Sequence, residues 1–543
     1  MESSTKTVTT LNSERETAQG RISTLAKLRH DRLFWLTAAL LAILLAFVVL
    51  FPLRAAGDIA LYADIGGRVL DGQRPYIDFF EINTPMIYLL NVLPVAFSRL
   101  TGIHPLIVFH LFIWLIVAGT ALSIGHISTR ACREKRLGNI SPWLMPMLLV
   151  FTSFAAWMLI AFGQRDHIFM LVFPAWGILR WYRWEGGQPP AWLAVLIGVL
   201  AAVGATLKPT FVLGVGLVEI YGLLRYRRWR AYFTWEILGA GIIVGAYGLY
   251  FAAQPEVLHA YLTEITPNIV AGYRSYGYIP ATELIFGVTQ SIVALILILI
   301  IALLGLRQGK GSGRFFVLLA LMGLAGLLSY ALQTKGWRYH SLPLLSSTFV
   351  IGGLLVERVF ALPGLRALLR RHRIAGVAPV MIIILCVVWG IVTAPQAIYG
   401  EASEAGLQSF RNYAQPGDSA ISADMEVIPF HPLVLQSGLK PVGRYPAAYP
   451  LAFAYADGEE IPDEVYDPAH TPPPLAQAYL DTFMHDIRVQ QPQLIVLRAL
   501  PCSVCIDVAR YVKVHTDIEA LLVREYDSLG LIAPYEVYVR KAA

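Results

Sequence analysis

The chain has 543 residues, of which 56% are hydrophobic and only 15% are charged, and its mean hydropathy is +0.57. Soluble domains carry about 25% charged residues, so this composition excludes an ordinary soluble protein and indicates an integral membrane protein. The net charge of +6 requires no nucleic-acid partner, because the cytoplasmic loops of membrane proteins collect Lys and Arg.

The first 30 residues are predicted to be a disordered cytoplasmic N-terminus. Residues 1–20 are polar and rich in Ser and Thr, which leaves them little apolar surface to bury. The first apolar run begins near Leu33 and is long enough to cross a bilayer. We therefore interpret it as a membrane span and not as a cleavable signal peptide.

Apolar runs recur through residues 31–397 and predict a mainly α, polytopic membrane protein. We predict about eleven spans, at 33–53, 105–128, 143–162, 168–182, 191–207, 209–224, 233–252, 283–305, 314–332, 341–360 and 375–395. Basic residues cluster in alternate loops, so all the clusters lie inside when the N-terminus is cytoplasmic. The pattern predicts a multi-pass protein of the plasma (inner) membrane.

Residues 85–101 are also apolar, and their interpretation decides the topology of everything that follows. If they crossed the membrane, Arg133, Lys135 and Arg136 would lie outside and the charge bias of all later loops would be inverted. We therefore predict that 58–101 is an external juxtamembrane loop, with amphipathic helices that lie at the membrane interface.

Residues 398–543 differ in character and are predicted to form an extracytoplasmic (periplasmic) α/β domain. The apolar runs 494–497 and 536–539 predict strands, while 475–489 and 517–526 predict amphipathic helices. Cys502 and Cys505 form a C-x-x-C pair, which we expect to be a structural disulfide in an oxidising compartment.

The outer connections of this topology carry charged residues that are costly near hydrocarbon unless they have a function or a partner. We take four acids as candidate catalytic residues: Asp58, Asp78, Glu81 and Asp166. The candidate substrate-binding residues of the same connections are Arg165, His167, Lys208, Arg274, Tyr276, Lys335, Trp337, Arg338, Tyr339 and His340.

Acids and cations together at an outer rim suit the transfer of a sugar from a polyprenyl-phosphate donor. A carboxylate can take the proton of the acceptor hydroxyl, and fixed cations can bind and stabilise the leaving phosphate. The bilayer delivers the donor, so no nucleotide-binding glycine loop is required. No second His or Cys stands at ligand spacing from His340, so we assign no metal site and no certain cofactor, and a need for a divalent metal stays open.

The order of short motifs in the first outer loop resembles the membrane-embedded GT-C glycosyltransferases. The motifs are Asp58-x-x-x-Tyr62, Gly72-x-x-Pro75-Tyr76-x-Asp78 and Glu81-x-x-x-Pro85, before an apolar stretch that ends at Gly102. The resemblance is greatest to the protein mannosyltransferase-like group, which includes lipid A aminoarabinose and galacturonic acid transferases. It covers roughly residues 30–395 and implies a GT-C core with polyprenyl-phosphate-linked sugar as donor.

The resemblance also implies roles for individual residues. The first-loop acid of the family corresponds to Asp58, the later loop acid to Glu81 or Asp78, and the acid at the outer end of a later helix to Asp166. The aminoarabinose branch has a Lys before the proline of the loop, whereas this chain has Asn83-Thr84-Pro85. This departure argues against aminoarabinose as the sugar, and Lys208 and Arg338 are our replacements for the missing cation.

Structural interpretations of the same residues stay open. Asp58 could cap a juxtamembrane helix, Asp78 or Glu81 could pair with Arg74, and Arg165 with Asp166 could be a local ion pair.

We expect the acceptor to be a glycan, a lipid or a protein hydroxyl. The alternative functions are a polysaccharide polymerase or ligase that uses a lipid-linked oligosaccharide, a transporter or flippase, and a non-catalytic membrane scaffold whose external tail binds partners. Membrane lipids are expected partners in every case.

Overall fold

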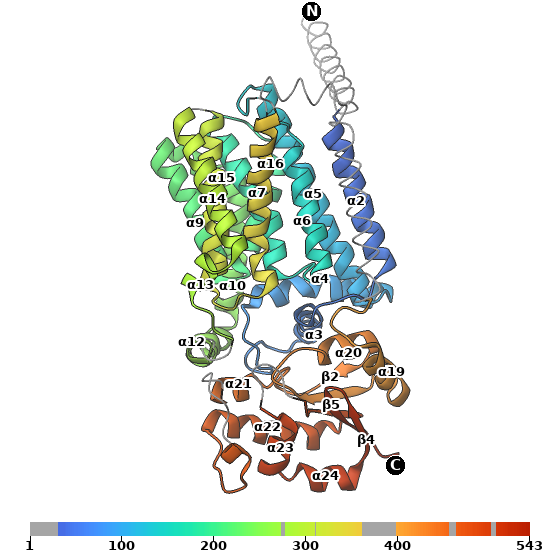
Figure 1. Ribbon diagram of the computed structural model, residues 1–543. Helices are drawn as coiled ribbons and strands as arrows, with labels where there is room; N and C mark the ends of the chain where they lie inside the picture. The colour runs from blue at the N-terminus through green and yellow to red at the C-terminus, as the bar shows by residue number, and fades with distance from the viewer. Residues whose placement is uncertain are drawn as a thin grey trace, which may run out of the picture.

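The computed structural model describes residues 31–138, 140–272, 277–309, 311–360, 398–455, 463–500 and 506–542. The predicted disordered N-terminus, Arg274 and Tyr276, the predicted span 375–395, and Cys502 with Cys505 lie outside these residues. The chain forms a long helix bundle with an α/β unit at one end (Figure 1).

The bundle helices begin and end close to the predicted spans. Six described helical segments are long and apolar enough to cross a membrane, and the chain is a multi-pass membrane protein. They are α2 (Arg32–Leu50), α5 (Pro105–Arg133), α10 (Trp235–Ala253), α14 (Thr289–Gln308), α15 (Ser312–Leu332), and α16 (Leu342–Phe360) with the preceding turn η3 (Arg338–Ser341). The bundle also contains α6 (Leu144–Met158), α7 (Arg165–Trp184), α8 (Ala191–Thr206) and α9 (Pro209–Tyr226). The total of about eleven spans stays a prediction.

Two helices of the first predicted outer loop lie between the bundle and the α/β unit. They are α3 (Gly57–Leu70) and α4 (Pro85–Thr101), and Figure 1 shows α4 lying across the end of the bundle, not along its axis. Gly102 ends α4 in the left-handed region, with φ at +71°. The helix α4 is thus oriented differently from the bundle helices, and the position of residues 85–101 at the membrane interface stays a prediction.

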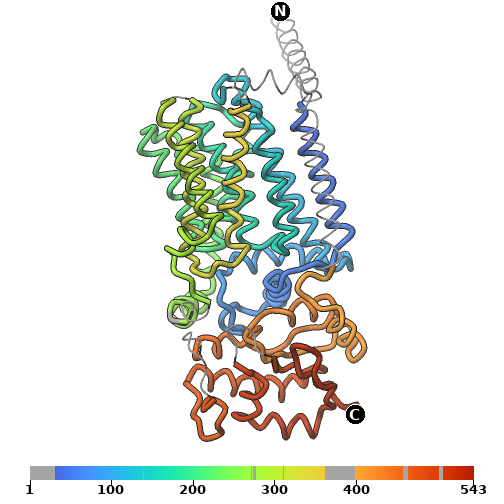
Figure 2. Tube along the Cα trace, in the orientation of Figure 1, coloured from blue at the N-terminus to red at the C-terminus, as the bar shows by residue number. Residues whose placement is uncertain are grey.

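The segment between α10 and α14 departs from the predicted single span at 283–305. It contains α11 (Pro255–Ala260), the π-helical turn η2 (Tyr261–Ile265), α12 (Thr266–Gly272) and the short α13 (Ala281–Phe286), which is separated from α14. α12 reaches beyond the bundle toward the α/β unit (Figure 2). It packs against α21 (Tyr449–Tyr455), where Gly272 faces Phe453. The predicted span was therefore too long at its start, because an apolar run does not reveal a break between two helices.

The α/β unit contains a five-stranded sheet covered by helices on both faces. Its order is β2 (Lys440–Pro441), β1 (Ser419–Ala423), β3 (Leu494–Arg498), β5 (Tyr535–Arg540) and β4 (Tyr526–Ile532), with β1 parallel to β2 and β3, and β5 antiparallel to β3 and β4. The alternating residues of β3 separate two cores. Leu494 and Val496 pack with α19 (Glu404–Tyr413) and α20 (Phe430–Ser437), whereas Ile495 and Leu497 pack with α22 (Pro474–Gln490), α23 (Val508–His515) and α24 (Ile518–Glu525).

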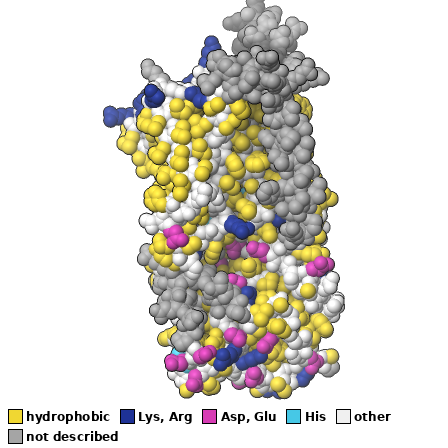
Figure 3. All heavy atoms as spheres, in the orientation of Figure 1, with side chains coloured by type: hydrophobic (Ala, Val, Ile, Leu, Met, Phe, Trp, Pro, Cys, Tyr) yellow, Lys and Arg dark blue, Asp and Glu magenta, His cyan; other side chains and the backbone are white. Residues whose placement is uncertain are grey.

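The surface differs between the flank of the bundle and its two ends. Hydrophobic side chains cover the flank in Figure 3, as expected for a surface in contact with lipid. Lys and Arg gather at the end farther from the sheet, and acids and cations appear together where the bundle meets the α/β unit. The candidate site residues that the structure describes lie at the end of the bundle that meets the α/β unit.

Close backbone contact joins α8 to α10. A Cβ atom at Gly198 would lie 2.0 Å from the carbonyl oxygen of Glu236, and a Cβ at Gly239 would lie 2.4 Å from that of Val195. Small residues allow helix backbones to approach in this way within membranes.

We expect Gly198→Ala to force α8 away from α10 and to destabilise the protein by about 1–3 kcal/mol, the usual range for overpacking. Gly248→Ala is the matched control, because a Cβ there meets open space. Thermal unfolding in detergent measures both. An unchanged midpoint for Gly198→Ala would contradict the close packing.

Candidate active site

Asp58 lies in the first turn of α3 and is half-buried. Among the described residues, no cation lies within ion-pair distance of its carboxylate. The helix end is capped by a different acid, since the Gly57 N–H donates to Oε2 of Glu401 at 2.6 Å. The capping role that remained open for Asp58 is therefore filled by a residue of the segment that leads into α19.

The α/β unit fixes the start of α3 through further backbone contacts. The N–H of Glu401 donates to the carbonyl of Ala55 at 3.0 Å, and Nε2 of Gln436 donates to the carbonyl of Leu53 at 2.7 Å. Gly400 has φ at +74°, and a Cβ there would lie 2.2 Å from the oxygen of Ala55. This close approach orients the helix that carries Asp58.

Glu81 lies fully buried in the loop between α3 and α4, and both of its carboxylate oxygens accept hydrogen bonds. The backbone N–H of Asn83 donates to Oε2 at 2.7 Å, Nδ2 of Asn83 donates to Oε1 at 2.8 Å, and the Tyr88 hydroxyl donates to Oε2. The remaining amide oxygen of Asn83 accepts from Nη1 of Arg165. Burial raises the pKa of Glu81 and these hydrogen bonds oppose the rise.

Asp166 and Lys208 form a buried ion pair between the start of α7 and the turn before α9. Nζ of Lys208 lies 2.5 Å from Oδ2 of Asp166 and 2.5 Å from Oε1 of Gln333, while Nε2 of Gln333 donates to Oδ1 of Asp166 at 3.3 Å. Burial lowers the pKa of the Lys208 ammonium to about 8, although Asp166 opposes that shift.

The turn after α15 places aromatic rings beside this pair, and it carries a second lysine whose charge acts on His340. Nζ of Lys208 lies 5.4 Å from the ring centroid of Tyr339, whose ring lies edge-on to His340 at 4.4 Å and tilted to Trp337 at 5.8 Å. Lys335 is buried, and that burial lowers its pKa to about 8. Aromatic side chains that carry a polar atom, such as Tyr339 and Trp337, are common at membrane interfaces and can also pack against sugar rings.

Electrostatic interactions connect these groups into one cluster. The charge of Asp58 acts on Arg165, Lys208 and Tyr339, and that of Asp166 acts on Arg165 and Lys208. The guanidinium of Arg165 lies 5.5 Å from the ring centroid of Tyr62. The structure thus brings together residues that are widely separated in the sequence, at the end of the bundle that faces the α/β unit.

Three predicted site residues have other surroundings. Asp78 is exposed and pairs with Arg74, with 3.3 Å between Oδ2 and Nε. Arg338 is exposed, so it does not share the buried environment of Lys208. His167 is fully buried in α7, where its Nδ1 accepts from the Gly163 N–H at 3.0 Å and so supports the turn before the helix.

The sequence interpretation missed two residues of the cluster, Gln333 and Tyr88, and it also missed Glu401, which caps α3. Gln333 bridges Asp166 and Lys208, and Tyr88 binds Glu81 from within α4. Tyr88 lies in an apolar run and Gln333 directly follows the predicted span 314–332, and neither gave a functional signal. Glu401 lies far along the chain from the helix that it caps. Among the described residues, no three His, Cys, Asp or Glu side chains are grouped so that they could hold a metal ion.

The comparison with solved structures confirms the predicted fold class, a mainly α polytopic membrane protein with a GT-C-type arrangement of helices, at the level of the fold. The fold of the chain is similar to that of ArnT from Cupriavidus metallidurans. The structure of ArnT bound to undecaprenyl phosphate matches with a TM-score of 0.55 and 13% identity, over 94% of this chain and 99% of ArnT. The apo structure matches with a TM-score of 0.56 and 14% identity, over 93% and 97%. No protein-family model matches the chain, and no curated protein matches it in sequence.

The Glu401 cap leads to a prediction about stability and pH. Burial is the main cause that raises the pKa of Glu401 to about 7, and the charges of Asp58 and Glu426 add to it. The hydrogen bond from the Gly57 N–H opposes this rise. The folded protein then holds the carboxyl proton more tightly than the unfolded chain, whose pKa is near 4.5. This contribution to stability is fully present below the unfolded pKa and is lost as the pH rises through about 7.

We therefore expect Glu401→Gln, which keeps an oxygen to accept from Gly57, to reduce the fall in the thermal unfolding midpoint between pH 4.5 and 7. Glu404→Gln is the control, because Glu404 is exposed nearby in α19. An identical pH profile in the wild type and Glu401→Gln would refute the role of this carboxyl.

Proposed function

We propose that the protein is a glycosyltransferase that moves a sugar from a polyprenyl-phosphate donor to an acceptor hydroxyl. The carrying observation is that half-buried Asp58 shares one end of a membrane bundle with the cations Arg165 and Lys208. The positive-inside rule puts that end on the outer face, because the arginine-rich loops are at the other. A lipid carrier would present its sugar at such a surface.

In this reaction Asp58 acts as the general base. The acceptor oxygen bonds to the anomeric carbon of the sugar while the bond between that carbon and the phosphate oxygen breaks. The hydroxyl proton passes to Asp58, and the electron pair of the broken bond leaves with the polyprenyl phosphate. A carboxylate without a cation at ion-pair distance keeps its oxygens available for this proton.

Arg165 and Lys208 bind the phosphate and stabilise the charge that it gains. In the described part of the chain Nε of Arg165 is buried without a hydrogen-bond partner, so a phosphate oxygen can satisfy it. Lys208 exchanges part of its contact with Asp166 and Gln333 for the donor. Fixed cations in a buried site stabilise a leaving anion more than the same charges in water.

Glu81 and Asn83 are assigned here as positioning residues. Glu81 is enclosed by Tyr88 and Asn83, and its effect reaches the phosphate through the bond from Arg165 to the Asn83 amide oxygen. Asn83 thus stands in the loop where the aminoarabinose branch has a lysine. We propose that the loop holds Arg165 in place of supplying its own cation, and that the donor sugar is not aminoarabinose.

The fold comparison supports the class of donor. ArnT, which shares this architecture over nearly the whole chain, has been solved with undecaprenyl phosphate bound. Tyr339 and Trp337 are proposed to face the sugar, because aromatic rings pack well against the apolar faces of sugar rings.

We expect Asp58→Asn to lower transfer by roughly 100- to 10,000-fold, the range for loss of a general base, while the protein still inserts and folds. The assay follows transfer of radiolabelled sugar from a polyprenyl-phosphate donor in membranes. Asp71→Asn is the control, since Asp71 forms an exposed ion pair with Arg99. Full activity of Asp58→Asn would remove the proposed base.

We expect donor binding to weaken as the pH rises through about 8, because the Lys208 ammonium then loses its proton. Lys208→Arg keeps its charge at higher pH, so it should move this decline to more alkaline values. Lys335→Arg is the matched control, because burial also lowers the pKa of Lys335 to about 8. A decline that moves in Lys335→Arg but not in Lys208→Arg would assign the phosphate contact to the other lysine.

A further inference from the structure

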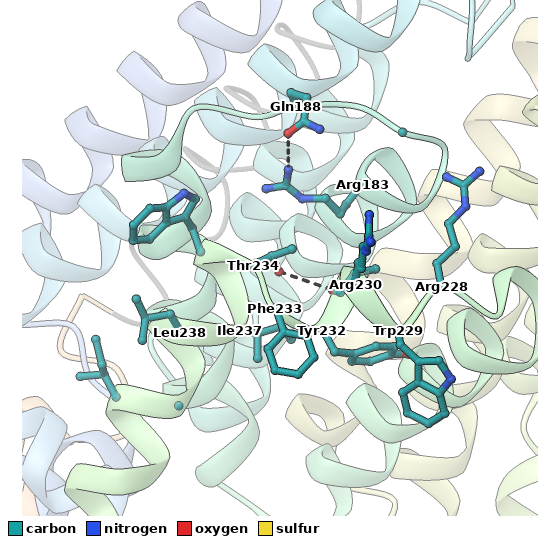
Figure 4. Close-up of a pocket in the computed structure, with 15 residues that line it drawn as sticks. Arg183, Gln188, Arg228, Trp229, Arg230, Tyr232, Phe233, Thr234, Ile237 and Leu238 are labelled. Carbon is teal, nitrogen blue, oxygen red and sulfur yellow. Dashed lines mark hydrogen bonds between the residues drawn. The ribbon is translucent and has the colours of Figure 1, made fainter.

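A large pocket opens at the arginine-rich end of the bundle, opposite the candidate active site. Its volume is about 1230 Å³, and it lies between the turn after α7 and the segment that connects α9 to α10. Figure 4 shows Arg183, Arg228 and Arg230 along one side of the pocket and the rings of Trp229, Tyr232 and Phe233 along another. Nothing in the proposed sugar transfer uses this pocket.

The deeper arginines at this end are neutralised within the protein. Arg180 pairs with Glu219 at 2.8 Å and with Glu236 at 3.1 Å, and Arg183 pairs with Glu236 at 3.1 Å. The positive charges of the two arginines are therefore balanced by the negative charges of the two glutamates. These buried pairs supply no excess charge to the pocket.

Arg228 and Arg230 supply the excess positive charge. Both are exposed, and neither has an acid within ion-pair distance among the described residues. Arg228 lines the pocket and donates one hydrogen bond, from Nη1 to the carbonyl of Trp184 at 3.0 Å. An anion that enters the pocket would meet two guanidinium groups whose charges are not compensated there.

Large apolar side chains stand beside these arginines and are exposed. Trp229 is 70% exposed, Phe233 88% and Trp235 53%. Exposed aromatic residues that cluster in this way indicate a site of interaction, whereas single exposed ones do not. The α10 face that lines the pocket continues with Leu238 and Ile242, which are 50% and 53% exposed, and with Gly241. A Cβ at Gly241 would meet open space, so this face is an uncovered apolar channel.

We propose that this pocket binds one anionic glycerophospholipid of the surrounding leaflet. Its phosphate binds Arg228 and Arg230, the aromatic rings lie at the level of the headgroup, and an acyl chain lies along α10 over Gly241. Charge complementarity selects an anionic lipid over a neutral one. The apolar channel that continues from the arginines selects a lipid over a soluble anion.

Native mass spectrometry of the full chain, purified in detergent, tests the proposal with phosphatidylglycerol and phosphatidylcholine of identical acyl chains. We expect retention of phosphatidylglycerol over phosphatidylcholine. The double variant Arg228→Gln/Arg230→Gln should lower that retention by roughly tenfold or more, as loss of two surface arginines implies. Arg225→Gln/Arg227→Gln is the matched control, because these exposed arginines of the same segment do not line the pocket.

A second pair of variants tests the acyl channel with all charges kept. Gly241→Phe should fill the channel and lower retention, whereas Ala246→Phe should not, because Ala246 is an exposed residue of α10 that faces away from Gly241 and does not line the pocket. Equal loss in both arginine double variants, equal retention of the two lipids, or full retention by Gly241→Phe would overturn the proposal. Displacement of the lipid by millimolar inorganic phosphate would identify a soluble-anion site and would overturn it too. Thermal unfolding of each variant verifies that the bundle is intact.

Discussion

The cost of placing charge at the end of a hydrophobic bundle shapes this protein more than any other constraint. Arg165, Lys208 and Glu81 each lie largely out of water, and each is held by specific partners: Asn83, Asp166 with Gln333, and Tyr88 with Asn83. An uncompensated charge in such a place would cost several kcal/mol. Asp58, which is half-buried and has no cation at ion-pair distance in the described chain, is the acid that this network leaves available.

The α/β unit takes part in the architecture of the site although it supplies none of the proposed reacting groups. Glu401 caps α3, and the backbone N–H of Phe80 donates to the carbonyl of Arg444 at 2.8 Å. Arg68 of α3 donates to the carbonyls of Gly443 and Pro441. The helix that carries Asp58 and the loop that carries Glu81 are thus both attached to the same unit, so their relative position depends on its folding.

The two ends of the bundle differ in how their charged side chains are paired and exposed. At the end near the sheet, acids and cations are interleaved and buried, which suits chemistry on a charged substrate. At the other end Glu219 and Glu236 neutralise the deep arginines, while Arg228 and Arg230 stay exposed beside aromatic rings. That second arrangement suits attachment to an anionic leaflet, and it separates orientation in the membrane from the site itself.

Most of the helix positions followed from the sequence, because apolar length and the sidedness of Lys and Arg are properties that lipid imposes locally. The interpretation of residues 85–101 as an interfacial helix depended on loop charge alone and stays a prediction, although α4 does lie across the end of the bundle. Only the tertiary structure revealed that Glu81 faces inward to Tyr88 and that Gln333 joins Lys208 to Asp166. It also decided that Asp78, and not Glu81, forms the pair with Arg74 that the sequence had left open. Those contacts join residues far apart in the chain or depend on how a loop folds, so no local period or motif encodes them. The sequence by itself determined which segments are apolar and long enough to span the membrane and on which side the charged residues are expected. Which buried charges pair with each other was decided only by tertiary packing, because that packing brings distant residues into contact.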